Sequence, residues 1–121
     1  MTGEIKRAVR VGGRVQQELA TLVRGLRDPR VDGVAVTRVE MTDDLSLARV
    51  YVRRELGSHD DRDRRAVLKG LEAASGKLRR DVARGVALRY TPNLRFFYDE
   101  GLEAASRVEE ILREIEQERD D

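Results

Sequence analysis

Residues 34–53 read VAVTRVEMTDDLSLARVYVR, and this stretch decides which fold class the chain can adopt. Its two flanks, 34–41 and 45–53, are rich in β-branched residues, and the polar residues 42–44 separate them. Two such runs joined by a short polar turn predict an antiparallel β-hairpin. In the second run, valine alternates with arginine and tyrosine. We therefore expect one face of the hairpin to be buried and the other to be exposed to solvent.

An amphipathic helix is predicted before the hairpin. Its apolar residues recur in steps of three and four: Val11, Val15, Leu19, Leu22, Val23 and Leu26. Gly12 and Gly13 each lower helix stability by about 1 kcal/mol relative to alanine, so we expect the start of this helix to fray. The sequence Asp28-Pro29-Arg30 ends the helix, because proline moves the preceding residue away from helical dihedral angles.

Two further helical stretches, a strand and a last helix are predicted after the hairpin. Asp60 or Asp61 is the expected N-cap of the first stretch, and Ser75-Gly76 marks a kink before the second. Residues 94–98 form a third strand, and Asp99 is the expected cap of the last helix. The apolar positions of these helices are Val67, Leu68, Leu71, Ala74, Leu78, Val82, Val86, Leu102, Ala105, Val108, Ile111, Leu112 and Ile115. This order predicts an α+β domain with its helices on one face of a small sheet.

The charges of the chain are divided unevenly along it. The net charge is +1, from 24 Lys and Arg against 23 Asp and Glu. Residues 1–98 carry 21 basic and 13 acidic side chains, whereas residues 99–121 carry 3 basic and 10 acidic side chains. A basic segment of net charge +8 favours contact with nucleic acid, and the acidic end of net charge −7 cancels it. The alternative is two solvated faces of opposite sign that keep the protein soluble.

Little in the sequence indicates catalysis or a cofactor. There is no cysteine, and His59, a residue expected to be solvated in a loop, is the only histidine, so no Cys or His cluster can hold a metal. Asp43 and Asp44 are adjacent in a turn and are expected to satisfy its backbone donors. No apolar run reaches the length of about 20 residues that crosses a bilayer, and we expect no signal peptide in the first residues, because Lys6, Arg7 and Arg10 interrupt their apolar residues. We expect a cytoplasmic, non-enzymatic domain without metal or cofactor.

The most informative segment for function is the kink Ala74-Ser75-Gly76 and the helix that follows it. If Leu78 and Val82 face the core, then Lys77, Arg80 and Arg84 form a basic stripe on the opposite side, interrupted at its edge by Asp81. The stripe begins at a helix N-terminus, where free N–H groups and the helix dipole favour phosphate. The alternative is an ordinary solvated helix face. Aromatic residues are few, which disfavours a base-stacking platform and favours recognition of the backbone.

The chain resembles the bacterial ribosome-binding factor A family over about residues 7–115. No single motif is decisive, but their order and spacing are specific. The motifs are Asp28-Pro29-Arg30, Val39-Glu40-Met41, Asp44-Leu45, Ala48-Arg49-Val50-Tyr51-Val52, Ala73-Ala74-Ser75-Gly76, Leu78-Arg79, Leu88-Arg89 and Pro92-Asn93-Leu94-Arg95-Phe96-Phe97-Tyr98-Asp99. The chain departs from the family at Gly12-Gly13, where the family has good helix formers, and its acidic terminal helix is variable in the family.

The resemblance implies a KH-like domain of the type II order α-β-β-α-α-β, over residues 1–98. The acidic helix 99–121 is expected to pack on this domain or to extend from it. Ordinary KH domains bind RNA with a Gly-x-x-Gly loop. None of the ten glycines has that spacing, and Ala74-Ser75-Gly76 fits the Ala-x-Gly kink that replaces the loop in this family.

The resemblance also implies a function. Such proteins bind free 30S subunits or their precursors and assist late maturation of 16S rRNA without catalysis, above all in the cold. The chain is expected to act as a monomer. The implied RNA contacts are Ser75, Gly76, Lys77, Arg80 and Arg84, with Arg7, Arg10 and Arg14 as weaker candidates. Two other functions stay open: a protein-interaction module that uses the C-terminal helix, and a hydrolase that uses Asp43 or Asp44.

Overall fold

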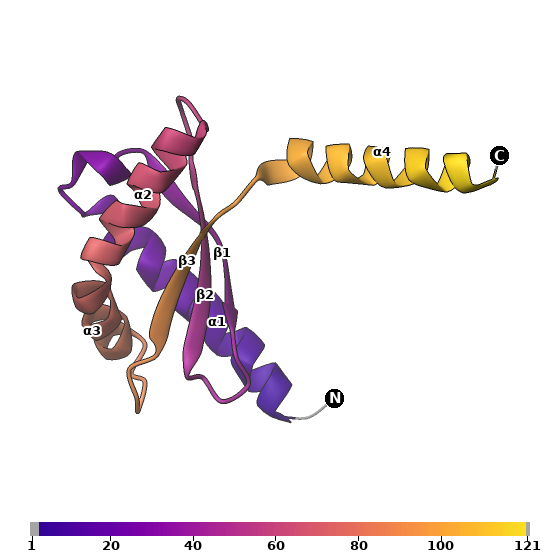
Figure 1. Cartoon of the computed structure of the whole chain (residues 1–121). Helices are drawn as coiled ribbons and strands as arrows, with labels where there is room; N and C mark the ends of the chain where they lie inside the picture. The colour runs from indigo at the N-terminus through magenta and orange to yellow at the C-terminus, as the bar shows by residue number, and fades with distance from the viewer. Residues whose placement is uncertain (1–2, 121) are drawn as a thin grey trace.

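The predicted hairpin forms part of a three-stranded sheet that is covered by helices on one face (Figure 1). The computed structural model describes residues 3–120, with the backbone alone for residues 102–108 and 120. Its elements in chain order are α1 (Gly3–Arg24), the 3₁₀ turn η1 (Pro29–Val31), β1 (Val34–Met41), β2 (Leu47–Arg54), α2 (Asp61–Ala73), α3 (Ser75–Gly85), β3 (Asn93–Tyr98) and α4 (Gly101–Asp120). The order up to β3 is the α-β-β-α-α-β order of a type II KH-like domain, and α4 follows it.

The sheet is mixed, with β2 in the centre. β1 pairs with β2 antiparallel, with Val39 opposite Val50, and the register shifts between Val36 and Arg38. β3 pairs with β2 in parallel, with Val50 opposite Phe96. Parallel neighbours need a crossover connection, and α2 and α3 supply it. The kinked helix pair is therefore held against the sheet by the path of the chain itself.

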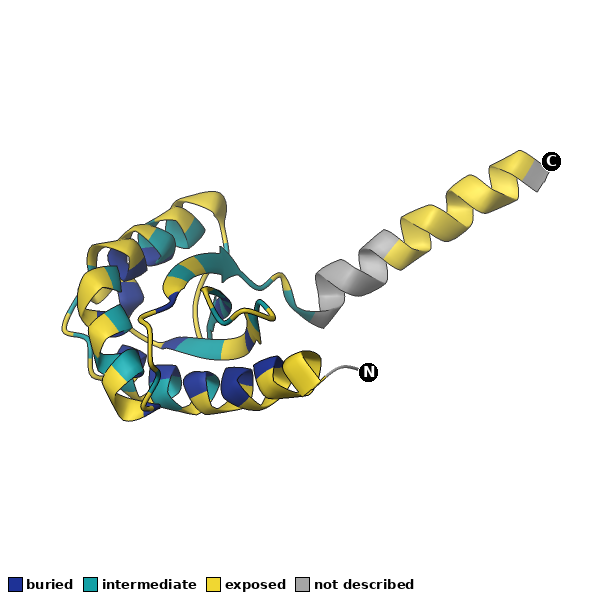
Figure 2. Cartoon of the chain, turned by 90° about the horizontal axis from the view of Figure 1, so that it is seen from below, coloured by how far each residue is buried: buried dark blue, intermediate teal, exposed yellow. Residues whose placement is uncertain are grey.

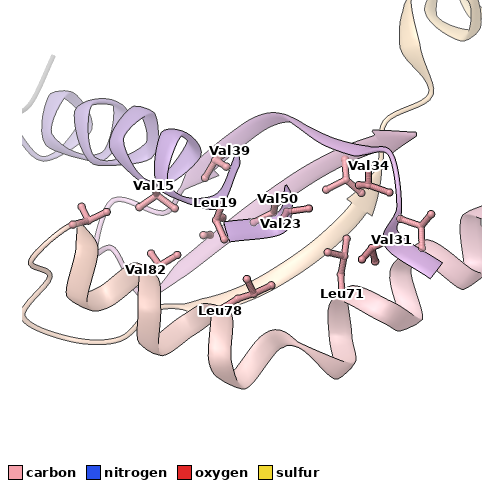
Figure 3. Close-up of a cluster of buried hydrophobic side chains, with 14 of the residues drawn as sticks. Val15, Leu19, Val23, Val31, Val34, Val39, Val50, Leu71, Leu78 and Val82 are labelled. Carbon is pink, nitrogen blue, oxygen red and sulfur yellow. The ribbon is translucent and has the colours of Figure 1, made fainter. Parts of the chain in front are cut away.

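The core lies between the sheet and helices α1, α2 and α3 (Figure 3). Every second residue of β2 points into it, because side chains alternate along a strand. Figure 2 shows the buried residues on the inner sides of the helices, as the apolar periodicity predicts. All three helices and β2 contribute fully buried side chains, among them Val15, Leu19, Val23, Val50, Val52, Val67, Leu71, Leu78 and Val82.

The expected fraying of the first helix at Gly12-Gly13 is wrong. α1 runs without a break from Gly3 to Arg24. Gly12 is buried, and a Cβ atom placed on it would lie 3.3 Å from the carbonyl oxygen of Val39. The glycine therefore lets α1 approach β1 closely, and burial of the apolar face outweighs the low helix propensity. Gly13 has open space at the same position and faces solvent.

These two glycines are expected to respond differently to alanine. Gly13→Ala should raise the free energy of unfolding by up to about 1 kcal/mol, because alanine favours the helix and meets no neighbour. Gly12→Ala should raise the free energy of unfolding by less, or lower it, because the added methyl group lies too close to the backbone of β1. Urea unfolding of both variants measures the difference. An equal gain in both variants would contradict the close approach.

The Asp28-Pro29-Arg30 motif leads into η1, and α2 packs against η1. The Asp28 side chain accepts a hydrogen bond from the backbone N–H of Arg30 (3.0 Å) and pairs with its guanidinium group (2.7 Å). This bonding lowers the pKa of Asp28. A Cβ atom on Gly70 would lie 2.8 Å from Cγ1 of Val31, so glycine at this position lets α2 pack directly on η1.

The C-terminal helix α4 points away from the rest of the chain (Figure 1). Asp99 precedes it and accepts hydrogen bonds from the Thr37 hydroxyl (2.7 Å) and from the backbone N–H of Gly101 (2.9 Å), which lower its pKa. Asp99 therefore holds the turn that leads into α4, which begins at Gly101, and its role as the helix cap stays a prediction. Ile111 and Ile115 of the predicted apolar stripe are 48% and 42% exposed. Leu102, Ala105 and Val108 lie outside the residues whose side chains are described.

Candidate nucleic-acid interface

The kink predicted at Ala74-Ser75-Gly76 separates α2 from α3. Ala74 lies between the two helices, with φ −90° and ψ −2°. Its N–H donates to the carbonyl of Gly70 (3.2 Å), and its carbonyl accepts from the N–H of Leu78 (2.9 Å). Leu71 before the break and Leu78 after it are both fully buried. The helical path therefore bends while its apolar side stays on the core.

The basic stripe of α3 lies where the sequence predicts it. Leu78 and Val82 are buried, and Lys77, Arg80 and Arg84 are exposed. We call the surface of these three residues with Ser75 and Gly76 the α3 face. Gly76 is exposed and Ser75 is half-buried. Within the described part of the chain, no side chain caps the first turn of α3, and the first N–H groups of a helix have no partner within the helix itself.

The charge of α3 distinguishes it from α2, the other helix with basic residues at the same spacing. α3 carries four basic residues and one acidic residue, Asp81, which lies 4.0 Å from the guanidinium group of Arg84. α2 carries four basic residues and three acidic ones. The basic residues of α2 are therefore largely balanced on their own helix. The α3 face has the greater net positive charge and is the better surface for a polyanion.

The first-helix arginines are not all gathered on one surface. Arg7 and Arg14 line a hollow of about 510 Å³ with Arg79 and Arg89, between α1, the turn joining β1 to β2, and the loop before β3. We call this hollow the basic groove. Arg10 is exposed outside its lining. The structure thus places Arg7 and Arg14 in the basic groove and leaves Arg10 outside both the groove and the α3 face.

The sequence reasoning missed Arg79 and Arg89 as candidate contact residues. Arg79 donates from Nε to the carbonyl of Pro92 (3.0 Å), which ties α3 to the loop before β3. Both arginines occur in motifs that resemble the family, Leu78-Arg79 and Leu88-Arg89, and this is the signal that could have found them. Their position beside α1 depends on the loop 86–92, whose path follows no periodic pattern.

Asp44 and Asp60, two acidic residues of the loops, have structural partners. Asp44 accepts hydrogen bonds from the Ser46 hydroxyl (2.7 Å), the Ser46 N–H (3.0 Å) and the Thr42 hydroxyl (2.8 Å), and these bonds lower its pKa. Its predicted role in the turn is confirmed. Asp60 caps α2 by accepting from the N–H of Asp63 (2.9 Å), as predicted. In the described residues, no three His, Asp or Glu side chains lie close enough together to hold a metal.

The expectation of a solvated His59 is wrong. The residue is half-buried, and its Nδ1 lies 2.6 Å from the hydroxyl of Tyr98. The same hydroxyl accepts the backbone N–H of Arg54 (3.1 Å). Since that bond uses the tyrosine oxygen as acceptor, its O–H can donate to His59. The histidine therefore fastens the loop before α2 to the ends of β2 and β3.

Four of the five aromatic rings are already covered. On the face of the sheet away from the helices, Tyr51 stacks on Phe97 with 5.4 Å between ring centroids. The guanidinium groups of Arg38 and Arg95 lie over these rings, 4.0 Å and 5.6 Å from the centroids. Phe96 and Tyr98 pack against the core, and Tyr90 alone of the five is largely exposed, at 74%. The sheet thus offers no open stacking platform, as expected.

The comparisons with known proteins agree with the fold and the motifs. The sequence model of the ribosome-binding factor A family matches residues 7–112. The ribosome-binding factor A of Sorangium cellulosum is 62% identical over 115 residues, which cover 95% of this chain and 93% of the relative. That of Brevibacillus brevis is 46% identical over 90% of this chain and 88% of its own length.

Solved structures give the same result. The crystal structure of ribosome-binding factor A from Thermus thermophilus superposes with a TM-score of 0.66 and 26% identity, over 75% of this chain and 93% of that one. A homology model of the Thermus thermophilus protein, as fitted into a cryo-electron-microscopy map of a 30S complex, matches with a TM-score of 0.60 and 27% identity, over 73% and 90% of the two chains. No described helix is both long and apolar enough to cross a membrane. The chain belongs to the ribosome-binding factor A family.

Proposed function

We propose that the chain binds the free 30S ribosomal subunit or its precursor and assists late maturation of 16S rRNA by non-catalytic contacts with RNA. The observation that carries this proposal is the net positive α3 face, which begins at the kink that stands in place of a Gly-x-x-Gly loop. The fit of a related protein into a map of a 30S complex supports the small subunit as the partner.

The α3 face suits an RNA backbone in three ways. The guanidinium groups of Arg80 and Arg84 can each bind two phosphate oxygens, and Lys77 adds a compact charge. The three residues span about 10 Å along the helix, at 1.5 Å per residue. The exposed Gly76 leaves room for a phosphate near the N–H groups of the first turn. Such contacts position a protein on RNA without reading its bases. Ser75, Arg7, Arg10 and Arg14 are proposed as further contacts.

The two parts of the chain have separate roles in this proposal. Residues 1–98 supply the RNA-binding domain, and the acidic segment 99–121, which contains α4 (Gly101–Asp120), tempers non-specific binding by repelling phosphates. The protein acts in the cytoplasm as a monomer without cofactor, and its action matters most in the cold, where misfolded RNA rearranges slowly.

A complementation experiment tests this function. In a bacterium that lacks its own copy of the gene, precursor 16S rRNA should accumulate at low temperature, and the wild-type chain should restore the mature form. The variant with Lys77, Arg80 and Arg84 replaced by alanine should fail to restore it. A matched variant, with Arg62, Arg65 and Lys69 of α2 replaced, loses the same charges at the same spacing and should succeed. Full rescue by the α3 variant would contradict the site.

A second candidate function rests on α4. This helix points away from the domain, and Ile111, Leu112 and Ile115 are exposed on it among acidic residues. An exposed apolar stripe in an acidic helix suits a basic protein surface. A chain truncated at Asp99 should still bind small subunits and should lose a protein that a photo-crosslinker at Leu112 captures in the full chain. Loss of subunit binding on truncation would instead place α4 in the RNA interface.

A further inference from the structure

We propose that the basic groove binds a single-stranded segment of RNA, with its phosphates among the arginines and one base stacked on Tyr90. The inference rests on the proposed function and deepens it, because it adds a second RNA site that differs in kind from the α3 face. The α3 face holds backbone only, whereas the groove has a ring on which an unpaired base can lie.

Three segments that are far apart in the sequence form the groove. Its lining comes from α1, from the turn between β1 and β2 at Leu45 and Ser46, and from α3 with the loop that follows it. The volume of about 510 Å³ lies within the range of about 300–1,000 Å³ that is typical of small-ligand sites. A nucleotide is a ligand of this size class.

The charge of the groove favours an anion. Four arginines line it, against one acidic residue, Asp44. The Asp44 carboxylate is already occupied by hydrogen bonds from Thr42 and Ser46, which hold it in the turn. Arg79 is tied to the loop by its bond to Pro92, and its remaining guanidinium nitrogens stay available. Arg7, Arg14 and Arg89 are exposed and can move to meet phosphates.

Tyr90 supplies a surface for a base. It is 74% exposed, and the guanidinium group of Arg89 lies 5.5 Å from its ring centroid. An aromatic ring beside arginines is the composition of single-strand binding surfaces, since bases of any sequence can stack on the ring while the cations follow the backbone. Tyr90 is the exposed ring of the five, and Arg89 is the arginine that lies near it, whereas the other four rings are half-buried by core packing, stacking or arginine contacts.

The backbone of the groove is unusual at two points. Leu45 (φ 62°) and Ala87 (φ 55°) are the non-glycine residues in the left-handed region within the described range, and both line the groove. Bulky residues avoid this region, and such positions concentrate at functional sites. At Ala87 the chain reverses, and the N–H of Leu88 donates to the carbonyl of Ala83 (2.9 Å). This turn carries Arg89 and Tyr90 back along the groove.

The kink lies at the N-terminal end of α3, and the groove extends from Arg79 in the middle of the helix to the loop after its C-terminal end. The helix has 11 residues and a length of about 16 Å, so one RNA can contact both sites. A backbone bound at the kink and an unpaired strand in the groove would place the protein at a junction of double- and single-stranded RNA. Tyr90 is then the residue that prefers unpaired nucleotides.

Fluorescence anisotropy with the full chain and a labelled single-stranded RNA of eight nucleotides tests the groove. Tyr90→Ala should weaken binding about tenfold, whereas Tyr90→Phe keeps the ring and should bind as the wild type does. Thermal unfolding should be unchanged in both variants, because the side chain is exposed. Unchanged affinity in Tyr90→Ala, equal loss in both variants, or no binding of the RNA by the wild type would each overturn the proposal.

Salt dependence tests the arginines separately. Arg7→Ala with Arg14→Ala should lower the slope of log affinity against log salt by about 1.4, at about 0.7 per phosphate of a single strand. Arg62→Ala with Arg65→Ala, on α2, removes the same charge and should leave the slope unchanged; equal slopes in the two variants would overturn the assignment. Failure of the groove would leave sedimentation with small subunits intact, whereas failure of the proposed function would abolish that sedimentation in the wild type.

Discussion

Replacing Leu71 with alanine is expected to lower the free energy of unfolding by about 2–5 kcal/mol, the usual cost of truncating a fully buried leucine. Leu71 is completely buried in the core on α2, three residues before the break at Ala74. Its removal leaves a cavity between the helix pair and the sheet. Because a domain of this size has only about 5–15 kcal/mol of net stability, the variant should be severely weakened. Urea unfolding followed by circular dichroism measures the loss.

Leu56→Ala is the matched control for this variant. The substitution is chemically identical, but Leu56 is 85% exposed in the loop after β2. Its effect should stay within about 0.5 kcal/mol, as for most surface substitutions. If the two variants lost equal stability, the helix pair would not pack on the sheet as described.

Replacing Lys77, Arg80 and Arg84 together with alanine should weaken binding to isolated small subunits by about 10- to 100-fold at physiological salt. Each of the three exposed cations is expected to neutralise a phosphate, and charged hydrogen bonds of this kind are the strong ones. The slope of log affinity against log salt should also fall by about 2–3 in magnitude. Binding titrations at several salt concentrations measure both quantities.

The control for this variant replaces Arg62, Arg65 and Lys69. These residues are one lysine and two arginines with the same spacing, and they are exposed on α2. The control loses the same net charge, so it separates a local contact from the general attraction of a basic protein to RNA. Equal weakening by the two triple variants would contradict the α3 face and indicate an unspecific effect of charge.

The periodicity of apolar residues predicted most of the fold, because the helices and strands of the domain each bury one side in the core. β1 spans the predicted residues 34–41, and the break between α2 and α3 falls at the predicted motif. β2 begins at Leu47 and not at residue 45, because Leu45 takes a left-handed conformation in a turn that extends to Ser46. A leucine gives no local signal for that conformation, which glycine usually adopts.

At the start of α1 the sequence predicted too little regular structure. Two adjacent glycines argued against a stable first turn, yet α1 begins at Gly3. Helix propensity is a weak preference that tertiary packing overrides, and the sequence contains no direct sign that Gly12 faces a backbone carbonyl of β1. A close approach of this kind becomes visible only when two elements are placed in space.

The candidate site was predictable in part for the same reason. Lys77, Arg80 and Arg84 share a helix, so their common face follows from helical spacing. The groove joins Arg7 to Arg79 and Tyr90 through an irregular loop, and no spacing rule brings such residues together. The basic and acidic segments of the chain are also separate in space, because the acidic helix α4 points away from the basic domain (Figure 1).

Sedimentation of the purified chain with ribosomal particles tests the central claim most directly. Free 30S subunits, whole 70S ribosomes and 50S subunits from the same bacterium are each centrifuged through a sucrose cushion with the chain at physiological salt. The account predicts that the chain pellets with free 30S subunits and stays in the supernatant with the other two particles. Equal recovery with 50S subunits, or preferential recovery with whole ribosomes, would contradict it.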